Sequence, residues 1–320
     1  MSVNEAIHRR DAVSIGCAHS GVSSTISRSG QTIGGDDYEI VLVNDGSPDA
    51  SLDLAVKLAE ADHHVVVVDL SRNFGHHKAM MTGLSMATGD SVFLIDSDLE
   101  EEPEWLVAFR QKMDAESLDV VYGVQTTRRG GLFERLSGHF FYPTFRLLTG
   151  IEQPDNVVTA RLMSRRYVDA LLLHRERELN IGGLWVITGF SQSQQVVTKH
   201  SSSPTSYSLR KKLSHFVNAV TSFSSLPLVL TFYAGLFTSI TALIFIGYLI
   251  FRFVFIAAPP DGYTSIIASI WLFSGIIIFF VGIQGIYIAK IFSEVKQRPR
   301  TIIRSVYQRH QRERSDMSDE

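Results

Sequence analysis

The chain has 320 residues, of which 45% are hydrophobic and 20% charged, and its formal net charge is −3 at pH 7. This near-neutral balance gives no sign of a nucleic-acid partner. Cys17 is the only cysteine, which excludes an intrachain disulfide and a cysteine-rich metal site, so any metal must be bound by oxygen or histidine. Because single hydrophobic cores stop growing at roughly 250–300 residues, the chain has room for one large domain and something more.

Residues 1–37 show no recognisable secondary-structure pattern. The stretch SIGCAHSGVSSTISRSGQTIGG is rich in Ser and Gly and has neither an apolar run nor a helical period. The amino terminus also lacks the basic-then-apolar order of a signal segment, which agrees with a domain that stays in the cytoplasm. We therefore expect no strand and no helix from this segment.

Strands and helices alternate from Tyr38 to Gln125. Short apolar runs end in polar turns, and helical patterns follow the turns. This alternation predicts a parallel sheet in an α/β domain of the nucleotide-binding type. The expected strands are Ile40–Val43, Val65–Leu70 and the runs SVFLID and DVVYGVQ, and the expected helices are Ser51–Ala61 and about His77–Ala87.

Polar residues follow the carboxyl ends of these strands, where α/β sheets bind ligands. Asp45 in VNDGSPD is either a ligand contact or a plain turn residue, since Asn, Asp, Gly and Ser favour turns for local reasons. The next turn, SRNFGHH, contains Arg72, Asn73, Gly75 and His76. A helix begins there, and its free N–H groups are suited to bind an anion. The alternative is that Asn73 caps the helix and Arg72 is solvated.

Two aspartates one residue apart, Asp96 and Asp98, end the run VFLIDSD. Strand residues two apart point to the same face, so the two carboxylates repel each other unless a cation lies between them. A hard divalent ion that also binds phosphate oxygens resolves this repulsion. The alternative is that Asp98 and the following glutamates stabilise a helix amino terminus. The three turns together favour the metal site.

The sequence is almost continuously apolar from Leu226 to Ile256 and from Ser265 to Phe292. Each stretch exceeds the ~20 residues that cross a bilayer. Neither has a polar stripe, so we expect two transmembrane helices rather than two buried core helices. Basic residues precede the first stretch and follow the second, whereas the connection AAPPDGYT has none, which predicts that both ends lie in the cytoplasm.

Several motifs occur in one order along residues 38–307: VNDGSPD, LSRNFGHHKAMMTGL, VFLIDSDLEEEPE, ARLMSRRYVDALL and AKIFSEVKQRPR. In this order they resemble the family 2 glycosyltransferases that charge polyprenyl phosphates, such as dolichyl-phosphate mannose synthase and its bacterial relatives with a two-helix membrane anchor. The resemblance implies a GT-A α/β domain with a mainly parallel central sheet, followed by a carboxyl-terminal transmembrane helical hairpin. It also implies an inverting hexosyltransferase of the bacterial inner membrane, which moves a sugar from a nucleotide-sugar donor to undecaprenyl phosphate with Mg²⁺ or Mn²⁺.

The resemblance also implies roles for individual residues. Asp45 matches the aspartate that contacts the nucleotide, and Asp96 and Asp98 match the pair that positions the ribose and the metal-bound diphosphate. The catalytic set is Asp96, Asp98 and Arg161, with the metal on Asp98 and Asp96, and the donor-binding set is Asp45, Arg72, Asn73, Gly75 and His76. The candidates for the acceptor phosphate are Arg128, Arg129, Tyr207 and Lys211, for which a solvated surface is the alternative.

The chain departs from the family at the catalytic base. Relatives often have an acid just before the segment ARLM, where this chain has Thr159. Asp155 or Asn156 substitutes from upstream, or no carboxylate is used; the assignment stays open. A phosphate monoester acceptor has a second pKa of about 6 and is already anionic near neutral pH, so a strong base is not required.

A second departure lies at the amino terminus. The family begins with a strand that forms one wall of the nucleotide site, and residues 1–37 do not show it. The interpretations are a divergent loop, a truncated inactive form, or a reading-frame error upstream of Asp36. The abrupt return of the pattern at Tyr38 favours the last.

Two other functions compete with the transferase. A GT-A-like membrane subunit that binds a nucleotide sugar or scaffolds a partner is favoured by the missing first strand and by Thr159, and opposed by the intact aspartates. A processive polysaccharide synthase needs more than two membrane helices.

The expected segments are 1–37, atypical; 38–207, catalytic; 208–225, an amphipathic helix at the membrane interface; 226–292, two transmembrane helices; and 293–320, a charged cytoplasmic tail. A homo-oligomer is left open.

Overall fold

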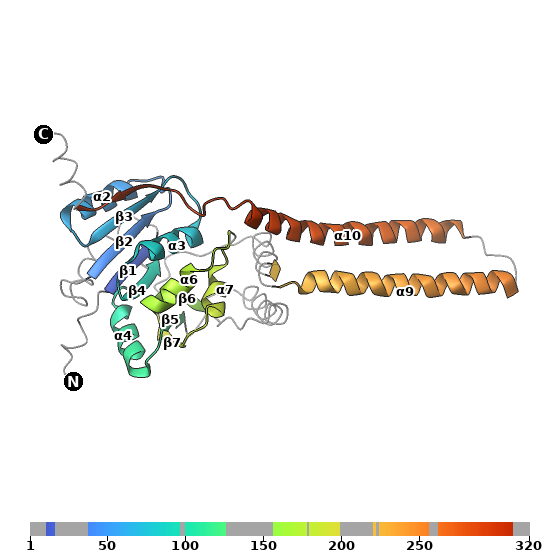
Figure 1. Ribbon diagram of the computed structural model, residues 1–320, viewed down its shortest axis with the longest axis horizontal. Coiled ribbons are helices and arrows are strands. Elements are labelled where there is room, and N and C mark those ends of the chain that lie inside the picture. The colour runs from blue at the N-terminus through green and yellow to red at the C-terminus, as the bar shows by residue number, and fades with distance from the viewer. Residues whose placement is uncertain are drawn as a thin grey trace. The chain divides into compact units, whose positions relative to one another are not determined.

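The structure is a computed structural model that describes residues 11–16, 38–96, 100–125, 156–177, 179–198, 220–221, 224–255 and 262–309. The chain forms two compact units. The first is an eight-stranded sheet covered by helices, and the second contains the two long helices α9 and α10 (Figure 1).

The sheet is mainly parallel, as predicted. Its strands lie in the order β7-β5-β6-β4-β1-β2-β3-β8. Strands β1 to β4 are parallel to their neighbours among themselves, β5 is parallel to β7, and only β6 and β8 are antiparallel to the strands beside them. The bounds are β1 Asp11–Gly16, β2 Tyr38–Asn44, β3 Val65–Leu70, β4 Ser91–Asp96, β5 Val120–Gln125, β6 Val157–Ser164, β7 Gln192–Val197 and β8 Ile303–Tyr307.

The expectation that residues 1–37 supply no strand is wrong. Strand β1 occupies the centre of the sheet, where Val13 pairs with Ile40 of β2 on one side and with Phe93 of β4 on the other. The segment DAVSIG has few apolar residues, so its local pattern does not predict a strand. Hydrogen bonds to a neighbour on each side, rather than local propensity, stabilise the extended backbone there.

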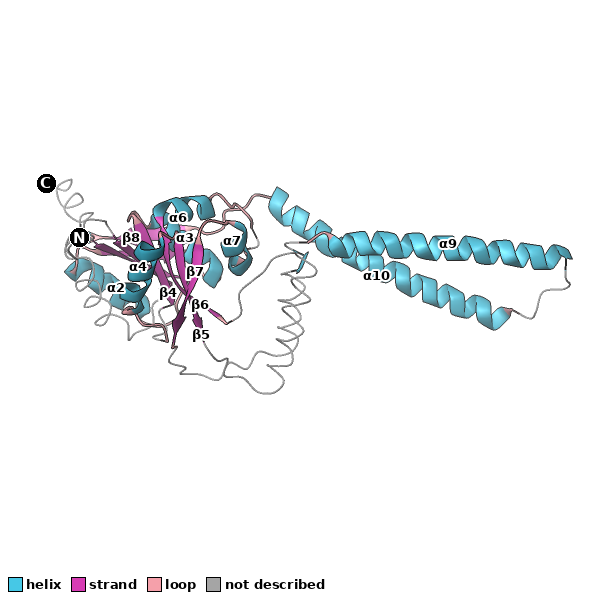
Figure 2. Cartoon of the chain, turned by 90° about the horizontal axis from the view of Figure 1, so that it is seen from below, coloured by secondary structure: helices cyan, strands magenta, loops and turns pink. Residues whose placement is uncertain are grey.

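Helices cover both faces of the sheet (Figure 2). Alternate residues of each strand point to opposite faces, so Ile40 and Leu42 share one core with Ala55 of α2 and Phe109 of α4. Helices α3 and α6 contact each other on the other face. The helix bounds are α2 Ser51–Ala61, α3 His76–Met86, α4 Trp105–Glu116, α6 Arg165–Leu172 and α7 Ile181–Ile187.

A buried aspartate fastens three elements of this unit. Asp119, just before β5, is 3% exposed. Its carboxylate accepts hydrogen bonds from Ser164 Oγ at 2.9 Å, Ser191 Oγ at 2.9 Å and Arg166 Nη2 at 2.8 Å. Burial raises the pKa of Asp119, but the hydrogen bonds from Arg166, Ser191 and Ser164 outweigh it, so this pKa lies below its ordinary value.

We expect Asp119→Ala to lower the free energy of unfolding by about 2 kcal/mol, because the variant removes the buried, charged acceptor of three side-chain hydrogen bonds. Since the folded pKa is depressed, the contribution is full above the unfolded value of 3.8 and is lost as the pH falls through the lower folded pKa. Denaturant unfolding of the full chain at pH 7 and pH 3 measures both effects. Asp169→Ala, which removes an exposed pair with Arg165, should change stability by less than about 0.5 kcal/mol; equal losses in the two variants would contradict the prediction.

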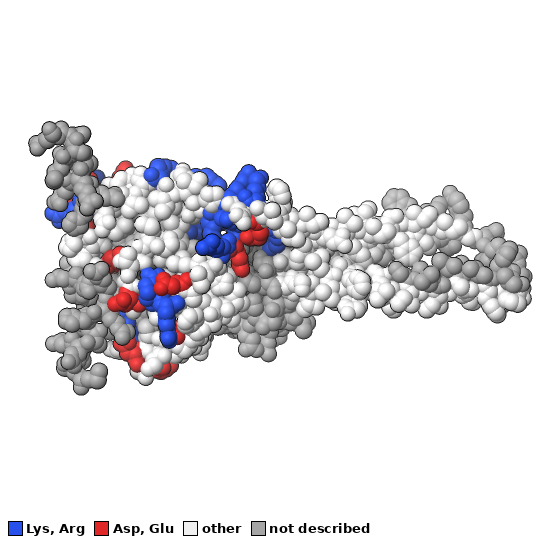
Figure 3. All heavy atoms as spheres, viewed as in Figure 1, with Lys and Arg blue, Asp and Glu red and all other residues white. Residues whose placement is uncertain are grey.

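The second unit contains α9, Leu226–Phe255, and α10, Tyr263–Val295. The two helices contact each other, and Tyr287 of α10 donates a hydrogen bond at 2.6 Å to the carbonyl of Ser224, just before α9. Within the described residues one helical stretch, Leu272–Val295, is long and apolar enough to cross a membrane, and α9 contributes a shorter apolar stretch, Leu226–Thr238. The face seen in Figure 3 shows charged side chains over the first unit and almost none along these helices.

The chain returns to the sheet after α10. Residues Ile303–Tyr307 form β8, which pairs antiparallel with β3 at the edge of the sheet. The sequence predicts only a charged tail here, because a single edge strand with charged neighbours has no strong local pattern. Of the expected tail 293–320, residues 293–295 are the end of α10 and residues 303–307 form β8. This segment therefore contributes a strand to the first unit.

Candidate functional site

The candidate site lies where β2, β3, β4 and β6 present polar residues. Asp45 follows β2 directly and is 4% exposed. Its Oδ1 accepts a hydrogen bond from the Phe74 N–H at 2.7 Å, and its Oδ2 accepts one from the Gly75 N–H at 2.9 Å. Asp45 therefore fastens the turn after β2 to the turn between β3 and α3, the two turns that were assigned to the donor.

The two turns also touch through a glycine. Gly46 has φ +71°, and a Cβ at this position would lie 2.7 Å from the backbone nitrogen of Asn73. Any larger residue would both strain this left-handed backbone and push the two turns apart. The Asn-Asp-Gly sequence is therefore required by a contact between turns as well as by the turn itself.

The N–H groups of Phe74 and Gly75, just before the first residue of α3, donate to the Asp45 carboxylate. The expectation that the free N–H groups of the helix itself bind an anion stays a prediction. Asn73 does not cap the helix, because Gly75 is the N-cap residue, with φ +100° and no side-chain cap. Arg72 is exposed, donates to the Asn73 carbonyl at 3.1 Å, and lies 4.2 Å over the ring of Phe74. The guanidinium is thus the accessible cation of this turn.

Asp96, at the end of β4, connects the turns to β6. Its Oδ1 lies 3.2 Å from Nε2 of His76, the first residue of α3. Its Oδ2 accepts a hydrogen bond from Thr159 Oγ1 at 2.7 Å. Thr159 stands where relatives often have an acid, and here its hydroxyl stabilises the Asp96 carboxylate without adding a second negative charge. Of the predicted site residues, His76 and Asp96 therefore lie in contact, and Thr159 adjoins them.

A second carboxylate, which the sequence analysis missed, lies behind Asp96. Glu101 is 2% exposed. Its Oε2 accepts a hydrogen bond from the Asp96 N–H at 3.1 Å, and its Oε1 accepts one from the Thr159 N–H at 2.9 Å. Glu101 thus joins the end of β4 to β6. The only sequence signal is its place in the run EEE, which looks like an exposed helix start.

Arg161 of β6 is fully buried, with 1% of its surface exposed. Its Nε donates to the Thr159 carbonyl at 3.3 Å, and its guanidinium lies over the ring of Trp185. Burial lowers the pKa of Arg161 to about 9, and attraction from Tyr167, Glu101 and Tyr122 opposes this decrease. Arg161 is therefore still a cation at neutral pH, and Glu101 is a buried countercharge.

Several assigned residues lie outside the described residues: Asp98, Arg128, Arg129, Tyr207, Lys211 and Asp155. The nearest described neighbours of Asp98 are Asp96 and Glu100, on the two sides of residues 97–99. The roles of these six residues rest on the sequence alone, whereas the contacts described above involve Asp45, Arg72 to His76, Asp96 and Arg161.

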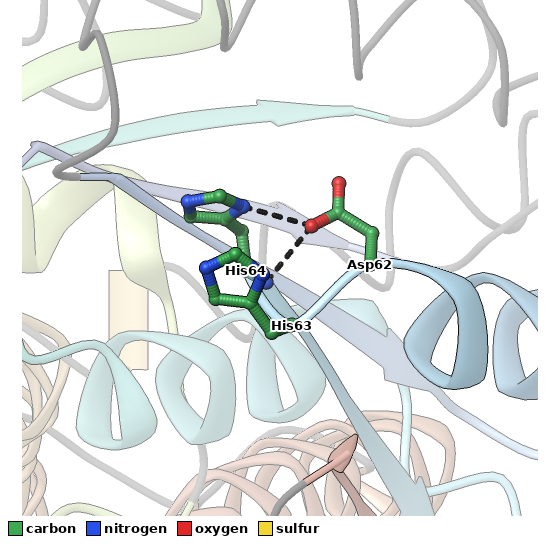
Figure 4. Close-up of side chains that lie close together, drawn as sticks. All are labelled: Asp62, His63 and His64. Atoms are coloured by element: carbon green, nitrogen blue, oxygen red, sulfur yellow. Dashed lines mark hydrogen bonds and ion pairs between the residues drawn. The ribbon is translucent and has the colours of Figure 1, made fainter.

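A separate group of side chains with metal-ligating atoms lies at the other end of β3. Ligand atoms of Asp62, His63 and His64 lie within 4.8 Å of one another (Figure 4). Asp62 Oδ1 accepts hydrogen bonds from the His64 N–H at 3.0 Å and pairs with His64 Nδ1 at 2.8 Å, while the Tyr38 ring stacks on His64 at 4.1 Å. These contacts fold the turn that precedes β3, and the cluster is remote from the carboxyl ends of the strands.

A mainly parallel sheet covered by helices on both faces defines an α/β protein, and its buried carboxylates, glycine turn and accessible arginine lie at the carboxyl ends of strands, where such sheets commonly bind ligands. Residues 22–172 match the model of the family Glycosyl transferase family 2. A protein of Mycobacterium tuberculosis that is described as one of the glycosyltransferases is 49% identical to this chain over 271 residues. The matched region covers 85% of this chain and 79% of that protein. The chain belongs to glycosyl transferase family 2.

Two further comparisons give finer descriptions. The bactoprenol glucosyl transferase of Shigella phage SfX is 32% identical, over 84% of this chain and 89% of that protein. A crystal structure of glucosyl-3-phosphoglycerate synthase from Mycobacterium tuberculosis, in complex with Mn²⁺, UDP and glucosyl-3-phosphoglycerate, is similar over 70% of this chain and 84% of that chain, with 18% identity and a TM-score of 0.45.

Proposed function

We propose that the protein transfers a sugar from a nucleotide-sugar donor to a polyprenyl phosphate, such as undecaprenyl phosphate, at the cytoplasmic face of a bacterial inner membrane. The observation that supports this most directly is the acidic edge of the sheet, joined by the same chain to long apolar helices. The bactoprenol glucosyl transferase named above, a protein of a similar length and 32% identity, has an activity of this class by its name.

The path of the chain supports two membrane crossings. Strand β7 precedes α9 and strand β8 follows α10, and both belong to one sheet. A chain that leaves a domain and returns to the same domain must cross a membrane an even number of times. If α10 crosses through Leu272–Val295, then α9, whose 30 residues are about 45 Å long, is the other crossing. The first unit then lies at one membrane surface, where a lipid phosphate is accessible.

The described residues suit the leaving diphosphate. Arg72 offers an exposed guanidinium at the turn after β3, and His76 lies beside Asp96 at the start of α3. Charge that develops on the departing diphosphate is stabilised by cations that are already in place before the reaction. We assign the nucleotide to the turns of Asp45 and Arg72, and the diphosphate to the region of Asp96.

The carboxylates of Asp96 and Asp98 fit the ligand preference of a hard divalent ion. Asp96 has a carboxylate that is 18% exposed at the strand end, Asp98 follows two residues later, and carboxylate oxygens are the ligands that Mg²⁺ and Mn²⁺ prefer. Bound there, either ion would supply electrostatic stabilisation to the diphosphate. We assign no catalytic base, because the acceptor phosphate, with a second pKa of about 6, is itself an anion near neutral pH.

The rival function, a membrane subunit without transferase activity, loses much of its support. It was favoured by the missing first strand and by Thr159. Strand β1 lies between β2 and β4, and Thr159 donates a hydrogen bond to Asp96. Both observations agree better with an active site that is intact.

The test is transfer of radiolabelled sugar from UDP-, GDP- and dTDP-sugars to undecaprenyl phosphate in membranes that contain the full chain. We expect one donor to give an organic-soluble product that EDTA abolishes and added Mg²⁺ or Mn²⁺ restores. Membranes without the protein are the control. No product from any donor, with the protein folded and inserted, would overturn the proposal and favour the binding subunit.

A further inference from the structure

Strand β8 carries an arginine at a bulge beside the candidate donor turns. In the pairing of β3 with β8, Asp69 is opposite Ser305 and Leu70 is opposite Ile303, so the register shifts and Arg304 is the extra residue. A bulge at a sheet edge redirects a side chain and often lies next to a functional site. The bulge therefore places Arg304 at the end of β3, where the chain turns toward α3.

Arg304 binds both β3 and the turn that follows it. Its Nη1 lies 3.4 Å from Asp69 Oδ2, and its Nη2 donates to the Ser71 carbonyl at 2.7 Å. The Ser71 N–H in turn donates to the Ile302 carbonyl at 2.9 Å. Asp69 is 1% exposed, and within the part of the chain that the structure describes its Oδ2 accepts no hydrogen bond. Arg304 is thus the countercharge of a buried carboxylate.

The same carboxylate holds the turn after β2. Asp69 Oδ1 accepts a hydrogen bond from Asn44 Nδ2 at 2.8 Å, and Asn44 Oδ1 accepts one from the Ser47 N–H at 3.1 Å. The residue after Asn44 is Asp45, which accepts the N–H groups of the second turn. Hydrogen bonds and the ion pair between Arg304 and Asp69 therefore connect Arg304 with both turns that were assigned to the donor.

We propose that Arg304 is a positioning residue for the nucleotide sugar: its guanidinium binds both the Asp69 carboxylate and the Ser71 carbonyl, and through these two contacts together it holds the turns of Asp45 and Arg72 in the conformation that binds the donor. This inference rests on the proposed function, which assigns those turns to the donor. The donor site then depends on β8, a strand that follows α10 in the chain. The site is then complete only when the chain has passed through both long helices and returned to the sheet.

The experiment compares Arg304→Met, Arg304→Lys and the matched control Arg309→Met in the full-length protein. Arg309 is an exposed arginine on the same segment, beyond β8. We expect Arg304→Met to raise the donor KM about tenfold, the size of one lost hydrogen bond to a charged group, while kcat changes less than about threefold. Arg304→Lys should recover most of the affinity, and Arg309→Met should equal the wild type.

A purely structural role would give a different result. It would lower the active fraction, and hence kcat, and leave KM unchanged, which would overturn the inference. Because Arg304→Met leaves a buried charge without its partner, the double variant Asp69→Asn with Arg304→Met is measured as well. We expect it to restore the melting temperature without restoring KM; a normal KM in a stable double variant would also overturn the inference.

The inference can fail independently of the proposed function. Titration of UDP and GDP into the same proteins measures nucleotide affinity without any transfer. If the wild type binds a nucleoside diphosphate and transfers no sugar to lipid, the proposed function fails, and weaker nucleotide binding by Arg304→Met still supports the positioning role. Equal affinities of wild type and Arg304→Met for the nucleotide would contradict that role.

Discussion

Asp98→Ala is expected to lower sugar transfer to the lipid phosphate by about 10²–10³-fold while the protein stays folded. The proposed metal is held by Asp98 and Asp96, and the leaving diphosphate loses its main source of electrostatic stabilisation when one of these carboxylates is removed. The measurement is the initial rate of radiolabelled lipid product at saturating donor, over a range of Mg²⁺ and Mn²⁺ concentrations.

The control for this variant is Asp114→Ala. Asp114 is an exposed aspartate on α4 and lies outside the candidate site. We expect it to transfer sugar at the wild-type rate. Retention of more than about a tenth of the activity by Asp98→Ala at the ordinary metal concentration would remove Asp98 from the metal site, since the loss of a preorganised charge costs far more than this.

Glu101→Ala is expected to have the largest effect on stability, a decrease of about 3–5 kcal/mol in the free energy of unfolding. The variant leaves the N–H groups of Asp96 and Thr159 without their acceptor, and it removes a buried countercharge of Arg161. Arg161 is buried, and Asp96 and Thr159 are half-buried, so water compensates only in part for the loss. Activity should fall as well, because the Asp96 backbone and the strand of Thr159 are held together by Glu101.

Glu101→Gln separates shape from charge in this network. The amide keeps the side-chain volume, but its NH₂ group faces one of the two N–H donors, so we expect a loss intermediate between the wild type and Glu101→Ala. Glu116→Ala is the matched control, because Glu116 is 51% exposed and pairs at the surface with Lys112 at 3.9 Å. Denaturant unfolding of the full chain measures all three. Equal stability of Glu101→Ala and Glu116→Ala would show that the buried network contributes nothing.

The elements with strong local patterns were predicted well. Strand β3 and helix α2 have the predicted bounds, and β2, β4, β5 and α3 differ from the prediction by a few residues at most. Their apolar residues repeat with the period of a buried strand or an amphipathic helix, which the sequence displays directly. Strands β1 and β8 were not predicted, because β1 is stabilised by a neighbour on each side and β8 by the edge of β3.

The sequence by itself determined the α/β class, the two long apolar helices and the acidic turns at the strand ends. Only the tertiary structure decided how those turns are held. Asp45 binds the backbone 29 residues further on, Thr159 binds Asp96 across 63 residues, and Arg304 binds Ser71 across 233 residues. Local patterns encode helices and strands, but contacts between distant residues follow from the order of the strands in the sheet. That order depends on packing of the whole domain, which no short stretch of sequence displays.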